Sequence, residues 1–184
     1  MNRADAKAEL VGHMKVLRAF ALNLARDHNT ADDLVQETVL RAWGNMDQFQ
    51  EGTNMRAWLF TILRNTFYEQ RRKAGREVAD ADGTYTASLA DKPTQDGQME
   101  LRDFRAAFQR LPAEQREVLM LIGALQHSYE DAAAICGVKV GTIKSRLNRA
   151  REAIAVEMRI GQGDTVAAAD PVADAVLSQS INSR

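Results

Sequence analysis

Residues 137–151 decide the fold, and they read Gly137-Val138-Lys139-Val140-Gly141-Thr142-Ile143-Lys144-Ser145-Arg146-Leu147-Asn148-Arg149-Ala150-Arg151. The stretch carries five basic side chains and no acidic one. A helix with one buried face is indicated by apolar residues three or four positions apart, at Val140, Ile143, Leu147, Ala150 and Ile154. Its other face would carry Lys144, Ser145, Asn148, Arg149 and Arg151. This basic face predicts contact with DNA, and the alternative is a solvated basic helix.

A shorter helix is predicted directly before this stretch. Tyr129 to Cys136 contains three consecutive alanines, which would let a second helix cross closely, and Gly137 would supply the turn between the two. Together they predict a helix-turn-helix, whose second helix presents the side chains near its N-terminus to base edges.

Composition limits the class of protein. The formal net charge of the 184 residues is -1, which argues against a protein that coats nucleic acid by bulk charge. The single cysteine, Cys136, is expected in the core, and the lack of an internal disulfide framework predicts a reducing, cytoplasmic location. No apolar run is long enough to span a bilayer and no leader is recognisable, so we expect neither secretion nor membrane insertion.

The sequence predicts an all-α protein with two small helical domains, at residues 1–76 and 101–160. Residues 77–100 carry six carboxylates against one lysine, so we expect a flexible acidic linker there, and residues 161–184 read as a frayed tail. In the first domain, helices are predicted at residues 9–28, 31–43 and 54–73, with Thr30 or Asp32 capping the second. The expected core includes Trp43, Trp58 and Phe67.

Four motifs in order resemble the extracytoplasmic-function (ECF) sigma factors of the sigma-70 family. They are residues 31–43 (ADDLVQETVLRAW), 58–65 (WLFTILRN) with the basic run after it, 111–119 (LPAEQREVL) and 141–147 (GTIKSRL). The resemblance implies a sigma region 2 bundle and a sigma region 4 helix-turn-helix joined by the linker. It also implies an alternative sigma factor that binds core RNA polymerase and directs promoter-specific transcription initiation.

Residues 65–73, NTFYEQRRK, are similar to the EcfG-like branch that runs a general stress response. Many other branches have Asp at the position of Tyr68. The branch implies a small helical anti-sigma factor of the NepR type, released when a response regulator with a sigma-like domain competes for it.

The family match implies that a coiled coil of the largest polymerase subunit contacts four residues, Asp32, Asp33, Gln36 and Glu37. The alternative is an ordinary polar face whose acids complement a helix N-terminus. For the upstream (-35) element the first choices are Lys144, Ser145, Arg146 and Arg149, with Lys139, Thr142 and Arg151 nearer the DNA backbone. Arg146 has a second interpretation, in which it holds the two helices of the helix-turn-helix together.

For the downstream (-10) element, the resemblance suggests that the loop at residues 46–53 accepts a flipped base, with Phe49 as its aromatic residue. Neighbouring bases or phosphates would contact Asn65, Tyr68, Arg71 and Arg72. Burial in the core is the alternative for Phe49 and Tyr68.

The sequence leaves two other classes of protein as alternatives. An enzyme is disfavoured because the three histidines are far apart, no metal-ligand spacing occurs and no phosphate-binding loop is present, so no cofactor, metal or small-molecule substrate is expected. His127 is expected at the surface or as a cap. The other alternative is a helix-turn-helix regulator that binds an operator without acting as a polymerase subunit, or a helical module that never meets DNA.

Overall fold

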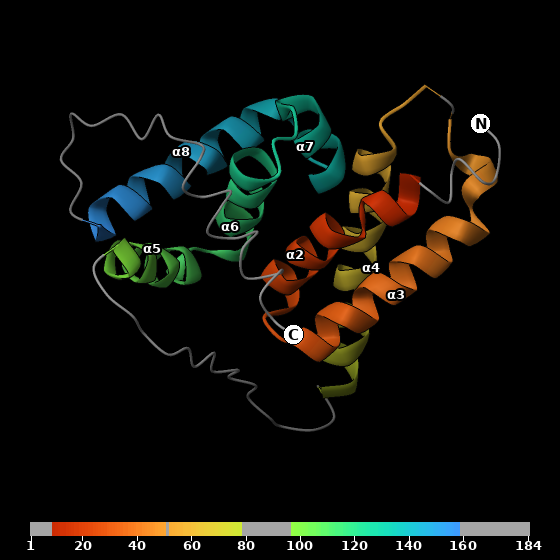
Figure 1. Ribbon diagram of the computed structural model, residues 1–184, viewed down its shortest axis with the longest axis horizontal. Coiled ribbons are helices and arrows are strands. Elements are labelled where there is room, and N and C mark those ends of the chain that lie inside the picture. The colour runs from red at the N-terminus through yellow and green to blue at the C-terminus, as the bar shows by residue number, and fades with distance from the viewer. Residues whose placement is uncertain (1–8, 51, 79–96, 159–184) are drawn as a thin grey trace. The chain divides into compact units, whose positions relative to one another are not determined.

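The computed structural model describes residues 9–50, 52–78 and 97–158, and every regular element in these ranges is helical (Figure 1). The all-α prediction is therefore confirmed for the described residues. The chain divides into two compact units, residues 1–89 and 90–184. The predicted linker, residues 77–100, overlaps helices at both ends, and its middle, residues 79–96, lies outside the described residues, as does the predicted tail.

The first unit is built on three helices that pack pairwise, α2 (Met14–Ala25), α3 (His28–Gly44) and α4 (Met55–Val78), with the short helix η1 (Met46–Gln48) between α3 and α4. Figure 1 shows α2, α3 and α4 side by side. Their core contains the fully buried side chains of Leu17, Phe20, Leu34, Leu59 and Leu63. The rings of Phe20 and Phe60 lie 5.0 Å apart, which joins α2 to α4.

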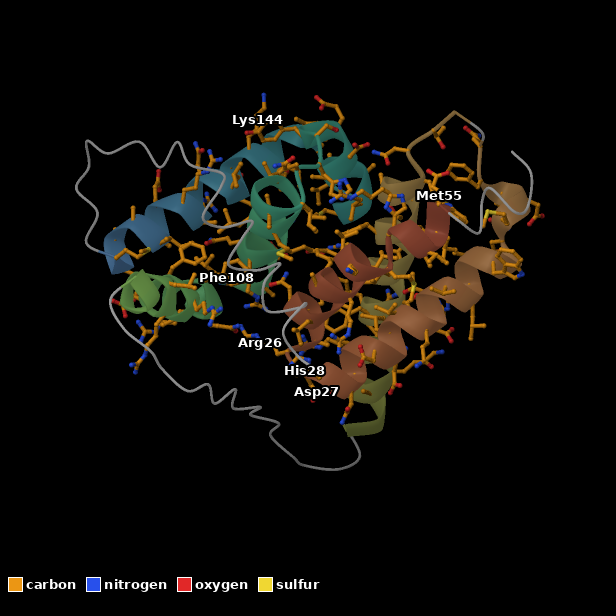
Figure 2. The ribbon with its side chains drawn as sticks, in the orientation of Figure 1. Arg26, Asp27, His28, Met55, Phe108 and Lys144 are labelled. Carbon is orange, nitrogen blue, oxygen red and sulfur yellow. The ribbon has the colours of Figure 1, made fainter. Side chains whose placement is uncertain are left out.

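The turn between α2 and α3 differs from the sequence prediction. Arg26 adopts a left-handed conformation (φ 61°) that ends α2 at Ala25. Asp27 then caps α3, because its Oδ2 accepts hydrogen bonds of 2.8 Å from both the backbone N–H and the hydroxyl of Thr30. Figure 2 labels Arg26 and Asp27 at this turn. Thr30 is thus a donor inside the first turn, and neither it nor Asp32 is the N-cap that we predicted.

The second unit contains α5 (Gly97–Arg110), α6 (Ala113–Leu119), the π-helical turn η2 (Met120–Ala124), α7 (Tyr129–Cys136) and α8 (Val140–Glu157). In η2 the Leu125 N–H donates to the Met120 carbonyl at 2.9 Å, a bond five residues long that defines a π-turn. His127 follows this turn and is only 6% exposed, so its predicted surface position is wrong.

The helix-turn-helix forms as its pattern predicts. Ser128 caps α7 by accepting from the Asp131 N–H at 2.9 Å, and Gly137 makes the turn with φ 65°, a conformation that suits glycine. The predicted apolar stripe of α8 is buried at Ile143, Leu147, Ala150 and Ile154, while Val140 is half-buried. Cys136 is in the core, as predicted.

Candidate nucleic-acid interface

The outward face of α8 is basic and polar. Five side chains of the predicted set are exposed: Lys144, Ser145, Asn148, Arg149 and Arg151. Lys139 is also exposed and is the N-cap of α8, and Thr142, half-buried, lies in the first helical turn. Free backbone N–H groups at such an end attract phosphate. The structure therefore places the predicted upstream-element residues on α8 and at its N-cap, and all but one of their side chains are exposed or half-buried without an ion-pair partner in the described residues.

Lys144 is linked to the first helix of the motif. Its Nζ lies 5.6 Å from the centroid of the Tyr129 ring on α7, within the range of a cation–π interaction. Figure 2 shows Lys144 at the outer side of α8. Ser145 donates its hydroxyl hydrogen to the Thr142 carbonyl at 3.0 Å, an internal bond that still leaves the side chain at the surface.

The exception is Arg146. Its side chain is only 17% exposed, and its Nη2 lies 2.5 Å from Glu114 Oε2 on α6. A second pair, Arg110 with Glu157, joins α5 to the other end of α8. Arg146 therefore holds helices together, which was its second interpretation, but the helix that it joins to α8 is α6 rather than α7.

A second basic surface lies on α4 at residues 64–73. Asn65, Arg71 and Arg72 are exposed, and Tyr68 is half-buried. The guanidinium carbon of Arg64 lies 4.6 Å from the Tyr68 ring centroid, and the Tyr68 ring meets the Phe67 ring edge-on at 5.2 Å. An aromatic ring beside a cation suits the stacking of an unpaired base. Arg64 was not among the predicted site residues, although its spacing of four from Tyr68 is a signal that could have identified it.

The loop before α4 contains the predicted aromatic, Phe49. Phe49 is half-buried, and its ring lies 5.3 Å from that of Trp58, which is also half-buried rather than in the core as predicted. The loop is closed locally, because Thr53 donates its hydroxyl hydrogen to the Gln50 carbonyl at 2.7 Å. Phe67, in contrast, is only 6% exposed, so its predicted place in the core is confirmed.

The predicted polymerase-contact residues on α3 do not share one environment. Asp33 and Gln36 are exposed, and the Glu37 side chain is 39% exposed. Asp32 instead takes two hydrogen bonds from Arg18 on α2, Nε to Oδ1 at 2.6 Å and Nη2 to Oδ2 at 3.1 Å. The Arg18 hydrogen bonds lower the pKa of Asp32 below its usual value. Asp32 thus ties α2 to α3.

Two large apolar side chains extend the outward face of α3. Leu40 is 69% exposed and Trp43 is 43% exposed, so the predicted burial of Trp43 is wrong. The physical reason is angular: at about 100° per residue, Trp43 projects on the side of Gln36 and Leu40, away from the buried Ala42. Sequence reasoning missed this stripe, although the spacing of four and three residues from Gln36 to Leu40 to Trp43 contains it.

A chain of ion pairs crosses from α3 to α4. Arg41 on α3 donates from Nε to Glu37 Oε1 and from Nη1 to Glu69 Oε2, both at 2.7 Å, and Lys73 Nζ lies 3.1 Å from Glu69 Oε1. The hydrogen bond from Arg41, followed by that from Lys73, lowers the pKa of Glu69 to about 2. We call Glu37, Arg41, Glu69 and Lys73 the ionic relay.

The described residues, 9–50, 52–78 and 97–158, include the three histidines and the single cysteine of the chain. There, no three of the His, Cys, Asp and Glu side chains gather closely enough to hold a metal ion. Within the same ranges, none of the helices combines the length and the apolar character needed to cross a bilayer.

Comparison with known proteins identifies both units. The family model described as Sigma-70 region 2 matches residues 11–77, and the one described as Sigma-70, region 4 matches residues 101–154. The chain is 52% identical over 166 residues to the ECF RNA polymerase sigma factor EcfG of Rhodopseudomonas palustris, covering 87% of this chain and 92% of that protein. It is 38% identical over 129 residues to the ECF RNA polymerase sigma factor SigC of Mycobacterium tuberculosis, covering 70% of each.

Solved structures agree with these relatives. The sigma factor RpoE of Bartonella quintana, crystallised in complex with the anti-sigma factor NepR, is 51% identical with a TM-score of 0.76, covering 86% of this chain and 99% of that chain. CnrH, solved in complex with the cytosolic domain of CnrY, is 25% identical with a TM-score of 0.60, covering 86% and 90%. The chain therefore belongs to the sigma-70 family and is an ECF sigma factor of the EcfG-like branch, which binds core RNA polymerase and directs promoter-specific initiation.

Proposed function

We propose that three surfaces divide the work of this sigma factor: α8 reads the upstream promoter element, α4 with the Phe49 loop captures the downstream element, and α3 docks on core RNA polymerase. Region 2 would comprise residues 1–76 and region 4 residues 101–160, with residues 77–100 as the linker and 161–184 as a tail. The observation that supports this division most strongly is that each unit has its own basic helix face with a buried opposite side.

On α8, the exposed Lys144, Ser145 and Arg149 are proposed to contact bases and phosphates, with Lys139 and Thr142 nearer the backbone. A bidentate base contact contributes about 1–3 kcal/mol of discrimination, whereas a phosphate contact adds affinity that depends on salt. Arg146 is proposed to position α8 through Glu114 rather than to read bases, because a short ion pair already occupies its guanidinium.

On α4, Asn65, Tyr68, Arg71 and Arg72 are proposed to hold the separated strand. Opening duplex DNA costs about 1.4 kcal/mol for each stacked step, so the protein must supply compensating contacts. Stacking on an aromatic ring supplies about 1–3 kcal/mol per base, and Tyr68 offers such a ring beside Arg64. Phe49 would leave its contact with Trp58, or rotate on it, to line the pocket for a flipped base.

On α3, the proposed polymerase-binding face combines Asp33, Gln36 and Glu37 with the exposed apolar side chains of Leu40 and Trp43. Carboxylates steer a basic partner and fix its register, and a partly exposed tryptophan is a typical interface anchor. Asp32 is proposed to fix the position of α3 against α2 rather than to contact polymerase, because Arg18 already donates hydrogen bonds to both of its carboxylate oxygens.

An anti-sigma factor is the second proposed partner. The structural relative from Bartonella quintana was solved with NepR, so we propose a small NepR-like helical protein as the inhibitor of this chain. The inhibitor would cover part of the residue 32–37 face and so exclude polymerase. Amide hydrogen exchange over residues 32–37 should slow when the two proteins combine, and unaltered exchange there would argue against this mode of inhibition.

The proposed setting is the cytoplasm, where core polymerase and promoter DNA are found, and the proposed role is that of a non-catalytic initiation factor in a stress response. The test is transcription from a promoter template with purified core polymerase. Addition of the chain should produce one defined transcript that core polymerase alone does not make. If no promoter-specific transcript forms although the chain binds core polymerase, the proposal fails.

A further inference from the structure

The basic segment of α4 at residues 64–73 contains one acidic residue, at a position where an acid should weaken DNA binding. Residues 64–73 include four basic side chains and a single carboxylate, that of Glu69. Glu69 follows Asn65 by four residues, so it lies about 40° around the helix axis from Asn65, at the edge of the proposed DNA surface. A carboxylate there would repel phosphate and compete with it for neighbouring cations.

Arg41 removes that carboxylate from competition. Arg41 Nη1 donates a hydrogen bond of 2.7 Å to Glu69 Oε2. The charge of Glu69 is therefore neutralised by a residue of α3 rather than by the arginines of α4. Lys73 shares the other oxygen at 3.1 Å, and its side chain is 66% exposed. A second bond, from Arg41 Nε to Glu37 at 2.7 Å, fixes the guanidinium in the orientation that reaches Glu69.

We propose that Arg41 is a positioning residue for DNA binding: because Arg41 pairs with Glu69 from α3, Lys73 can leave Glu69 for a phosphate of the promoter strand without leaving that carboxylate unpaired. This inference rests on the proposed function of α4 as the downstream-element surface. Arg41 itself does not contact DNA in this account. It acts through Glu69, and Glu37 acts through Arg41.

The consequence of losing Arg41 can be worked out from the relay. Without the Arg41 guanidinium, Lys73 is the remaining partner of Glu69, so Lys73 could move to a phosphate only by leaving that carboxylate unpaired. One phosphate contact to single-stranded DNA contributes about 0.7 to the slope of log affinity against log salt concentration. Over a tenfold range of salt, this slope corresponds to about fivefold in affinity.

The experiment uses holoenzyme assembled from the full chain and saturating core polymerase. Four proteins are compared: the wild type, Arg41→Gln, Glu69→Gln and the double variant. Promoter affinity is measured between 0.1 and 1 M salt, a range of about one decade over which the counterion effect is linear. We expect Arg41→Gln to bind about fivefold more weakly at the low-salt end, with a slope smaller by about 0.7. Glu69→Gln should bind at least as well as wild type, and the double variant should recover wild-type affinity.

Recovery in the double variant separates positioning from a structural role, because Glu69→Gln breaks the same bridge as Arg41→Gln. If the bridge merely stabilised the fold, both single variants would be weakened and the double variant would be no better. That result would overturn the inference. A matched control combines Arg41→Gln with Glu9→Gln, which removes an exposed carboxylate of the same unit outside the relay. This combination should not recover affinity, and its recovery would equally overturn the inference.

Two further measurements distinguish a failure of the proposed function from a failure of the proposed role of Arg41. Core polymerase affinity is measured for each variant, because Arg41 also contacts Glu37 on the proposed polymerase face. Promoter-specific initiation by the wild-type holoenzyme is measured in the same preparation. If the wild type does not initiate, the proposed function fails. If it initiates but Glu69→Gln does not restore Arg41→Gln, only the role of Arg41 is refuted.

Discussion

Arg149 and Arg146 lie three residues apart on α8, and replacing each by glutamine should have opposite consequences. Arg149 is exposed and has no ion-pair partner among the described residues, so its charge is available to DNA. Arg146 is 17% exposed and paired with Glu114 on α6. The two substitutions remove the same charge from the same helix, and each serves as the control for the other.

The expected magnitudes follow from these environments. Loss of one duplex phosphate contact reduces the salt slope by about 0.9, which corresponds to about eightfold in affinity over a tenfold salt range. Arg149→Gln should therefore weaken promoter binding by the holoenzyme at low salt and leave thermal unfolding unchanged. Arg146→Gln should leave the slope unchanged but lower the unfolding free energy of the second unit by about 1 kcal/mol. For a domain of this size, that loss lowers the melting temperature by about 4–8 °C.

The assay is a salt titration of promoter binding by each holoenzyme, with thermal unfolding of each free chain in parallel. Lys15→Gln, an exposed charge removed from α2 in the other unit, controls for overall charge. The reasoning is refuted if Arg146→Gln reduces the salt slope as much as Arg149→Gln does, or if Arg149→Gln leaves it unchanged.

Three further substitutions have defined outcomes. Leu147→Ala, at a side chain 1% exposed, should cost about 2–5 kcal/mol of unfolding free energy by denaturant titration, whereas Asn148→Ala, at an exposed position, should change it by about 0.5 kcal/mol or less. Arg18 lowers the folded-state pKa of Asp32, so the stabilisation that this pair gives the first unit is complete above the ordinary carboxyl pKa of 3.8 and is lost as pH falls from there through the lowered folded-state pKa. Asp32→Asn should therefore flatten the pH dependence of the melting temperature below pH 3.8. Tyr68→Ala should slow promoter opening more than Tyr68→Phe in a permanganate reactivity assay, and equal rates would exclude stacking.

The parts of the fold that sequence reasoning predicted depend on local periodicity. The stripe of α8 alternates at three and four residues, and Gly137 stands where a positive φ is required, so both helices of the motif and the turn between them follow from neighbouring residues. The same reasoning placed Phe67 correctly, because it lies on the stripe that Leu59 and Leu63 define.

The errors have two other causes. Trp43 was assigned to the core by residue type rather than by its angle on α3. The bonds of Asp32 with Arg18 and of Arg41 with Glu69 join residues on different helices, 14 and 28 positions apart. No periodicity reveals such pairs, because they depend on how helices pack. For the same reason, the sequence could not decide whether the Arg146 side chain contacts another helix or solvent.

The most direct test of the central claim is a protection map of promoter DNA obtained with the chain alone, with core polymerase alone and with both. The two basic surfaces lie on separate units of the chain. We propose that they recognise promoter DNA specifically only when the chain is bound to core polymerase. We predict two separate protected segments, upstream and downstream, with reactive unpaired bases in the downstream one, only when both proteins are present. Full protection of both segments by the chain alone, or by core polymerase alone, would contradict the account.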